Sequence, residues 1–224
     1  MIIGALTVGQ SPRDDIIPEI QEMLGPGHTF IERGALDGLS PDEIGELYPD
    51  SSDRTLVTRM SDGTEIKVAE RYIGPRLQDC IDDLEERGAE LLVLLCTGDL
   101  SELESRKPLL RPDRLLRSLT GGILEEGSLG IVVPASEQMP DARERWETTG
   151  YEVHTFAISP YTLNDNDIAI ITGQIELQNT DLIVLDCIGF NTSMKERFRQ
   201  ETGRPVLLPR TVLGGIIKEM VTDG

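Results

Sequence analysis

Two cysteines end two similar apolar segments of the chain. The segments read LLVLLCTG at residues 91–98 and LIVLDCIG at residues 182–189, so that each cysteine stands two places before a glycine. A buried run of Val, Ile and Leu is typical of a parallel strand, and ligands bind beyond the carboxyl ends of such strands. We therefore predict that Cys96 and Cys187 are catalytic residues that face one cleft from opposite sides.

Paired thiols suit proton transfer at carbon. Inverting a carbon next to a carboxylate needs a base on one face of the substrate and an acid on the other. A thiol with a pKa of about 8.5 serves in both roles when helix dipoles and neighbouring donors lower that value towards neutrality. This chemistry needs no metal and no organic cofactor, so we expect none. The alternative is that a cysteine is a small buried hydrophobe, and for Cys80, in an amphipathic helical stretch, we prefer that interpretation.

Residues that could bind a small carboxylate follow each cysteine. Gly98 and Gly189 permit a tight turn and a close approach of the ligand to backbone N–H groups. The other polar residues are Thr97 and Asp99 after the first cysteine, and Asn191, Thr192 and Ser193 after the second. For the stretch GFNTSMKERF two interpretations stay open, because the same residues also predict an N-cap for the next helix.

The loop after the first strand, TVGQSPRDD, holds the candidates Gly9, Gln10, Ser11 and Arg13. Ser11 and Pro12 predict a helix start, with Ser11 as the N-cap and Pro12 at the first helical position. This start does not account for Gln10, or for Arg13, whose charge opposes the helix dipole. We therefore expect Arg13, or the Gln10 and Ser11 amides, to hold a substrate carboxylate.

Other polar residues carry weaker indications. Tyr161 could line the cleft or merely pack, and Asp186 points to the opposite side of its strand from Cys187, which favours a structural role. Neither His28 nor His154 has a candidate partner, and His154 falls inside a predicted strand. No Cys and His spacing predicts zinc, and neither G-x-G-x-x-G nor G-x-x-x-x-G-K-[ST] occurs, which argues against nicotinamide and ATP chemistry.

Apolar runs alternate with amphipathic stretches along the chain, which predicts an α/β fold with parallel sheets. The predicted strands are 2–8, 29–33, 91–96, 128–133, 151–157, 182–187 and 205–208. The predicted helices lie near 14–24, 41–47, 71–87, 111–119, 137–149, 165–178, 193–202 and 211–221. Residues 55–70 alternate about Asp62-Gly63 and predict a small antiparallel hairpin insertion.

The second half of the chain echoes the first. LLVLLC is matched by LIVLDC, KPLLRP (107–112) by RPVLLPR (204–210), and IIGALTVG by LGIVVPAS. Each match is weak alone, because buried parallel strands share the same residue types. Three matches in the same order predict two related, Rossmann-like α/β units.

The charge balance limits the partners. The chain of 224 residues has 21 basic and 40 acidic residues, a net charge of −19, and four of its basic residues are Lys. Such a surface repels nucleic acids and anionic membranes, so we expect neither as a partner. The acidic residues are spread along the chain, which resembles halophilic adaptation to high internal salt, where screening removes the self-repulsion.

The compartment expected from the sequence is the cytoplasm. No apolar run approaches the roughly 20 residues that cross a bilayer, and the start, MIIGALTVGQSPRDD, lacks the basic region of a signal peptide. The three cysteines are odd in number and too few for a disulfide framework, which fits a reducing compartment. The expected partner is a small carboxylate metabolite, and the sequence leaves a homo-oligomer open.

The motifs TVGQSPR, LLCTGD and LDCIGFN, in this order, resemble those of the AroM family. That family is similar to the Asp/Glu/hydantoin racemase superfamily, in which two pseudo-symmetric α/β domains each contribute a cysteine to a shared cleft. The resemblance implies that Cys96 and Cys187 hold the catalytic positions. It also implies that the C-terminal helix near 211–221 packs on the first domain, so the expected domains are 1–122 with 209–224, and 123–208.

The chain departs from the racemases at two places. Those enzymes usually carry Asn-Thr after the first cysteine and Thr after the second, whereas Thr97-Gly98 and Ile188-Gly189 stand here. The resemblance therefore does not extend to an α-amino acid substrate.

Two hypotheses follow. The first is a cofactor-independent racemase, epimerase or isomerase of a small carboxylate, with Cys96 and Cys187 as acid and base. In a variant of this hypothesis, which occurs within the same superfamily, one thiolate acts as a nucleophile. The second is a non-catalytic binding or regulatory protein of aromatic amino-acid biosynthesis.

Overall fold

The computed structural model describes residues 1–100 and 102–221 and shows two compact units. Unit 1 comprises Met1–Pro112 and Leu213–Gly224, and unit 2 comprises Asp113–Val212. Both are built on a parallel sheet, and a small antiparallel sheet is added to the first, so the predicted α/β class is confirmed. Within the described ranges, no helix has both the length and the apolar character that a bilayer span requires.

The sheet of unit 1 has the order β2-β1-β5-β6, and all of its strands are parallel. Its strands are β1 (Ile2–Thr7), β2 (Thr29–Gly34), β5 (Leu91–Leu95) and β6 (Leu109–Leu110). The antiparallel pair is β3 (Thr55–Arg59) and β4 (Glu65–Ala69), which confirms the hairpin predicted about Asp62 and Gly63. The short strand β6 was not predicted, because two leucines between charged residues give no periodic signal.

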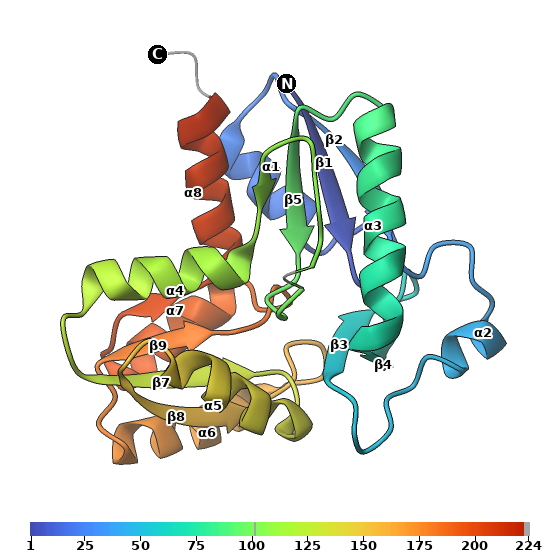
Figure 1. Cartoon of the computed structure of the whole chain (residues 1–224). Coiled ribbons are helices and arrows are strands. Elements are labelled where there is room, and N and C mark those ends of the chain that lie inside the picture. The colour runs from blue at the N-terminus through green and yellow to red at the C-terminus, as the bar shows by residue number, and fades with distance from the viewer. Residues whose placement is uncertain (101, 222–224) are drawn as a thin grey trace. The chain divides into compact units, whose positions relative to one another are not determined.

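Helices cover both faces of this sheet. They are α1 (Ile17–Leu24), α2 (Pro41–Gly45), α3 (Glu70–Glu86) and the later part of α8 (Pro209–Val221). Figure 1 shows α3 on one side of the sheet and α1 and α8 on the other. The α3 face is a core of β1, β5 and hairpin side chains against Ile73, Leu77 and Ile81. A Cβ atom on Gly214 would lie 2.3 Å from Met23 Cε, so α8 packs closely on α1, as the resemblance implied.

Unit 2 repeats this plan with the strand order β10-β9-β7-β8, again all parallel. Its strands are β7 (Ser128–Val133), β8 (Glu152–Ala157), β9 (Leu182–Leu185) and β10 (Val206–Leu207). Its helices are α4 (Pro112–Ile123), η1 (Ser136–Gln138), α5 (Met139–Glu147), α6 (Asp165–Leu177) and α7 (Thr192–Thr202). One apolar core joins the sheet to α6 and α7, and another joins its other face to α4 and α5.

The two sheets share topology and register, in agreement with the sequence echo. β1, β2, β5 and β6 correspond to β7, β8, β9 and β10, because each unit has the same neighbour order. Ile3 pairs with Leu91 in one sheet and Leu129 pairs with Leu182 in the other. Cys96 and Cys187 each stand five residues beyond the second member of these pairs. The two cysteines therefore occupy equivalent positions in the two units.

The start of the first helix differs from the prediction. Ser11 is not the N-cap and Pro12 is not the first helical residue, because α1 begins at Ile17 with Ile16 at the N-cap position. The Ser11 N–H and hydroxyl donate instead to the Asp37 carboxylate, over 2.8 and 2.6 Å. This long-range partner replaces the local hydrogen bond that an N-cap serine would make.

Acid stability should depend on Glu85 at the end of α3. Its carboxylate accepts hydrogen bonds from the Ser105 hydroxyl, the Arg106 N–H and side chain, and the Lys107 N–H over 2.5–3.1 Å. Burial alone would raise its pKa, but these donors outweigh burial and lower the pKa from 4.5 to about 2. A depressed carboxyl pKa stabilises the native state above the unfolded-state pKa, and this contribution is lost as pH falls towards the folded-state value.

Glu85→Gln is therefore expected to lower the free energy of unfolding by about 2 kcal/mol at neutral pH, since charged hydrogen bonds are lost. The difference from the wild type should shrink as the pH falls from 4.5 towards about 2, the two ends of this pKa shift. Denaturant titrations at several pH values measure this difference in the free energy of unfolding. The exposed neighbour Glu86 supplies the control variant, Glu86→Gln. An undiminished difference at the acid end would contradict the assignment.

Candidate functional site

The loop after β5 is organised around the sulfur of Cys96. Cys96 follows the last strand residue, Leu95, and the Gly98 N–H donates to its Sγ over 3.2 Å. A Cβ atom on Gly98 would lie 2.8 Å from Leu56 Cδ2 of the hairpin, so this close approach favours glycine. Thr97, between them, is buried. The loop thus turns the Gly98 N–H back towards the thiol.

The loop after β9 has the same organisation around Cys187. The Gly189 N–H donates to Cys187 Sγ over 3.4 Å, and the Phe190 N–H donates to the Cys187 carbonyl over 3.3 Å. A Cβ atom on Gly189 would lie 2.6 Å from Tyr161 Cζ and 2.7 Å from Pro160 Cγ. Tyr161 therefore packs on the Cys187 loop. That it also lines a substrate cleft stays a prediction.

The repeated N–H donor to sulfur has a chemical consequence. A hydrogen bond donated to a sulfur atom stabilises the negative thiolate more than the neutral thiol. In both loops the donor is the glycine two residues after the cysteine, so the C-x-G spacing seen in the sequence is the spacing that this bond requires. Each loop thus places one N–H donor against the sulfur of its cysteine.

Cys80 provides the contrast within the same chain. It belongs to the apolar core between α3 and the sheet of unit 1. Burial raises the pKa of its thiol from 9.0 to about 11. Cys80 is therefore the buried hydrophobe that the sequence predicted, and it stays protonated at neutral pH.

The first loop contacts the hairpin. A Cβ atom on Gly9 would lie 2.3 Å from the Arg59 carbonyl oxygen and 2.5 Å from Thr58 Oγ1. Gln10 Oε1 accepts hydrogen bonds from the Ser61 N–H and hydroxyl, over 3.1 and 2.8 Å. Gly9 and Gln10 thus fix the β3–β4 hairpin on the loop. Their contribution to substrate binding stays a prediction.

Arg13 lies buried behind this loop and makes internal contacts. Its guanidinium donates to Thr7 Oγ1 over 2.9 Å and to both oxygens of Asp15 over 2.8 and 2.9 Å. Its N–H donates to Glu32, whose pKa is raised because burial outweighs that hydrogen bond. Arg13 is therefore paired with Asp15 inside the protein, and its contact with a substrate carboxylate stays a prediction.

Asn191 and Thr192 begin α7. Asn191 is the N-cap, and its side-chain oxygen accepts the Met194 N–H over 2.9 Å. Thr192 is the first residue of the helix. Of the two interpretations left open by the sequence, the capping role of Asn191 is present in the structure. Contact of either residue with substrate stays a prediction.

Two charged contacts near Cys187 were missed by sequence reasoning. Arg210, at the start of α8, donates to the carbonyls of Ile188 and Gly189 over 2.7 and 2.9 Å. Asp186 accepts hydrogen bonds from Trp146 Nε1 over 2.9 Å and from Arg145 over 3.2 Å. The residues of each contact are 21 to 41 positions apart, so no local pattern predicts them. The echoed RPVLLPR segment was the one sequence signal that pointed to Arg210.

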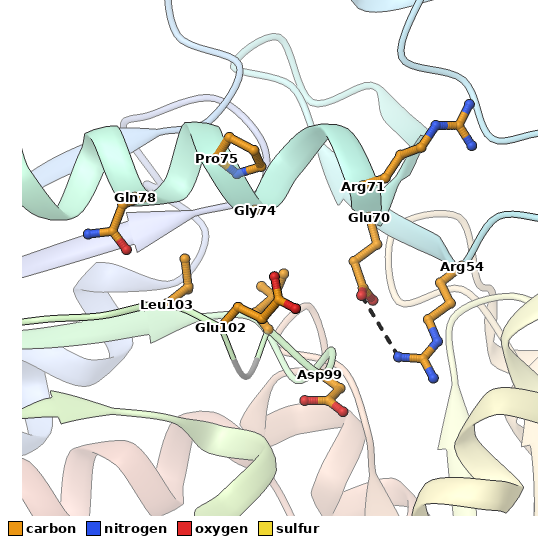
Figure 2. A pocket seen from close by; sticks show the side chains of 10 residues that line it. Arg54, Glu70, Arg71, Gly74, Pro75, Gln78, Asp99, Glu102 and Leu103 are labelled. Atoms are coloured by element: carbon orange, nitrogen blue, oxygen red, sulfur yellow. Dashed lines mark ion pairs between the residues drawn. The ribbon is translucent and has the colours of Figure 1, made fainter.

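A cavity of about 520 Å³ adjoins the loop after Cys96 in unit 1. The first turns of α3, including Glu70 and Gly74, form one wall, and Asp99, Glu102 and neighbouring leucines form the other. Figure 2 shows Arg54 paired with Glu70 at one side, at a distance of 3.9 Å. Among the described residues that line the cavity, Asp99 is the one that the sequence singled out. The cavity therefore lies beside the predicted site residues.

No group of three or more His, Cys, Asp or Glu residues in the described part of the chain is placed to hold a metal ion. Within the described residues, Cys80, Cys96 and Cys187 form no disulfide bond.

Solved structures share this fold. The chain superposes over 99% of its length on 87% of an allantoin racemase from Klebsiella pneumoniae, with a TM-score of 0.65 and 13% identity. It superposes fully on 93% of an arylmalonate decarboxylase, with a TM-score of 0.62 and 14% identity. Over 99% of its length it superposes on 84% of a glutamate racemase from Aquifex pyrophilus, with a TM-score of 0.59 and 13% identity. The fold is therefore that of the two-domain racemases.

The family is more specific than the fold. The family model described as AroM protein matches residues 3–221, and the chain belongs to the AroM family. No curated protein sequence matches the chain.

Proposed function

We propose that the protein is a cofactor-independent racemase, epimerase or isomerase of a small carboxylate, with Cys96 and Cys187 as its acid and base. The observation that carries the proposal is the repeated loop: each cysteine follows the same strand of its sheet and accepts an N–H from the glycine two residues on. A core cysteine needs no such donor, and Cys80 has no equivalent loop because it lies within α3.

The proposed reaction moves one proton. The thiolate of one cysteine takes the proton from the carbon next to the substrate carboxylate, and the electron pair of the broken C–H bond passes into the carboxylate as an enediolate. The thiol of the other cysteine then donates its proton to the opposite face of that carbon. The product is the mirror-image centre, and the two cysteines have exchanged protonation states, so the reverse reaction resets them.

The residues after the cysteines favour a substrate without an amino group at the reacting carbon. Ile188 has no polar atom in its side chain, and Thr97 is buried, so the two side chains offer little to an ammonium group. We propose a small acid whose carboxylate is held by backbone N–H groups of the two glycine-containing loops other than those of Gly98 and Gly189, which donate to the cysteines. The setting is the cytoplasm that the three free thiols led us to expect.

A second candidate is a binding or regulatory protein that lacks turnover. The observation that favours it is the internal pairing of Arg13 with Asp15, since this arginine was the cation expected to hold a substrate carboxylate. In this case the thiols are bystanders, and ligand binding needs neither of them.

The test is a screen of small chiral carboxylates for hydrogen exchange with D2O, followed by NMR. A substrate should gain one deuteron at the reacting carbon. Cys96→Ser and Cys187→Ser should each lower the rate by at least about 100-fold, the usual size of a general acid–base contribution. Cys80→Ser is the matched control and should leave the rate unchanged. Binding of a carboxylate that both serine variants retain, without exchange, would support the second candidate instead.

A further inference from the structure

Arg210 is a buried cation that contacts the Cys187 loop through its backbone. The residue is 3% exposed and stands second in α8. Its Nε donates to the Ile188 carbonyl over 2.7 Å and its Nη2 to the Gly189 carbonyl over 2.9 Å. A charge is costly to bury unless it is well satisfied by acceptors, and these two carbonyls are strong ones. The contact therefore fixes two consecutive peptide groups next to Cys187.

One of these peptide groups also touches the sulfur. The Ile188 carbonyl and the Gly189 N–H belong to the same planar peptide unit. Arg210 binds the carbonyl end of that unit, and the N–H end donates to Cys187 Sγ over 3.4 Å. A cation on a carbonyl oxygen draws electron density from the peptide, and this strengthens the N–H as a donor. The positive charge of Arg210 is thus transmitted to the sulfur through a single peptide.

We propose that Arg210 is a positioning residue that holds Cys187 as the resting thiolate of the proposed cysteine pair. This inference rests on the proposed function and deepens it, since it assigns Cys187 as the first base for one enantiomer of the substrate. Arg210 acts by orienting and polarising the peptide whose N–H donates to the sulfur.

The other groups around Cys187 do not replace this role. Asp186, the preceding residue, would oppose a thiolate, but its carboxylate is paired with Arg145 and accepts the Trp146 N–H. Tyr161 packs on Gly189. Cys187 also belongs to an apolar core that includes Ile158, Phe190 and Phe198. Arg210 is the cation with direct hydrogen bonds to the Cys187 loop among the described contacts.

The first unit contains a matched arginine with a different target. Arg111 directly follows β6, whereas Arg210 stands three residues after β10, and Arg111 is also buried, at 7% exposed. Arg111 Nη2 donates over 2.7 Å to the carbonyl of Leu103, seven residues after Cys96. Arg111 therefore holds the far end of its loop, whereas Arg210 holds the peptide that touches the sulfur. This difference makes Arg111 the natural control.

The experiment titrates Cys187 alone. In a Cys80→Ser, Cys96→Ser background, the ultraviolet absorbance of the thiolate is followed against pH, and the signal of the variant that also carries Cys187→Ser is subtracted. Arg210→Met should raise the titration midpoint by at least about one pH unit, which is a tenfold smaller thiolate fraction on the acid side of the midpoint. Arg210→Lys keeps the charge without the planar pair of donors and should give a smaller rise. Arg111→Met should lower thermal stability and leave the midpoint unchanged.

Two results would overturn the inference: a midpoint that neither Arg210 variant moves, or an equal rise in Arg111→Met, which would mean that general loosening is responsible. If Arg210→Met does not fold, Arg210→Lys with the Arg111→Met control still decides between these outcomes. No substrate enters the titration. A protein without hydrogen-exchange activity but with the expected midpoints would refute the proposed function and keep the role of Arg210 in thiolate formation.

Discussion

Asp186→Ala is expected to lower the free energy of unfolding by roughly 3–5 kcal/mol, because it leaves a buried positive charge without its partner. The Asp186 side chain is fully buried, and Arg145 beside it is 14% exposed. Burial would lower the pKa of Arg145, but the nearby carboxylates, Asp186 first and then Asp141 and Asp113, outweigh it and raise the pKa, so Arg145 is charged in the native state. Removal of Asp186 also leaves the Trp146 N–H without its 2.9 Å acceptor inside the α5 core.

The measurement is a denaturant titration of unit 2 within the whole chain, followed by the fluorescence of Trp146, the single tryptophan of the sequence. Glu196→Ala is the matched control. Glu196 pairs with Arg199 over 2.7 Å on the surface of α7, and both side chains are more than half exposed. Exposed pairs contribute little, so this variant should unfold with the wild type.

The double variant Asp186→Ala, Arg145→Met should recover part of the loss. Removing both charges abolishes the unpaired cation, although the Trp146 N–H still lacks its acceptor. An Asp186→Ala variant that is no less stable than Glu196→Ala would show that this ion pair does not support the fold.

The two halves of the fold are equivalent in topology and differ in chemistry at the residue before each cysteine. Asp186 corresponds to Leu95, and both stand directly before the cysteine. Leu95 is an ordinary core residue, whereas Asp186 joins the Cys187 loop to α5 through Trp146 and Arg145. Together with Arg210, this contact attaches the Cys187 loop to α5 and to the first turn of α8. The Cys96 loop instead packs on the hairpin through Gly98 and Leu56. The hairpin therefore packs on the loop of Cys96, and the Cys187 loop is attached by Asp186 and Arg210 instead.

Sequence reasoning succeeded where the signal was periodic or local. The apolar run 91–95 and the turn at Asp62 and Gly63 lie in a strand and a hairpin as predicted, because strand burial and turn chemistry are encoded by adjacent residues. The equivalent cysteines were found for the same reason, since the echo preserves spacing. The N-cap predicted at Asn191 is present as well.

The same reasoning failed where a distant partner decides the structure. Ser11 has the residue type of an N-cap, but Asp37, 26 residues away, takes both of its donors. Arg13 was expected to bind substrate because a positive charge at the start of a helix opposes the helix dipole. The helix, however, starts four residues later, at Ile17, so this reason does not apply to Arg13. Its partner Asp15 is two residues along the chain, but the fold that buries the pair is not a local property.

Gly9→Ala is expected to cost about 3 kcal/mol and to displace the β3–β4 hairpin, because an added Cβ would lie 2.3 Å from the Arg59 carbonyl oxygen and 2.5 Å from Thr58 Oγ1. The Arg59 carbonyl is part of the hairpin backbone and also accepts the Gln10 N–H over 3.4 Å, so it has little freedom to move away. Gly9 does not have a positive φ, so alanine is compatible with the backbone and the effect is steric.

Gly214→Ala is the matched control for this steric argument. Its Cβ would meet Met23 Cε at the same 2.3 Å, but that atom is the end of a flexible side chain, which can turn aside. Alanine is also preferred to glycine within a helix by about 1 kcal/mol, so this variant should stay close to the wild type in stability.

Unfolding titrations compare the two variants, and amide hydrogen exchange at Thr58 and Arg59 reports on the hairpin. Faster exchange there in Gly9→Ala alone is the expected result, whereas equal stability and equal exchange in both variants would mean that the hairpin does not rest on Gly9. Since Leu56 of the same hairpin packs on Gly98, a displaced hairpin should also expose Cys96 to alkylation, which links the first loop to the proposed site.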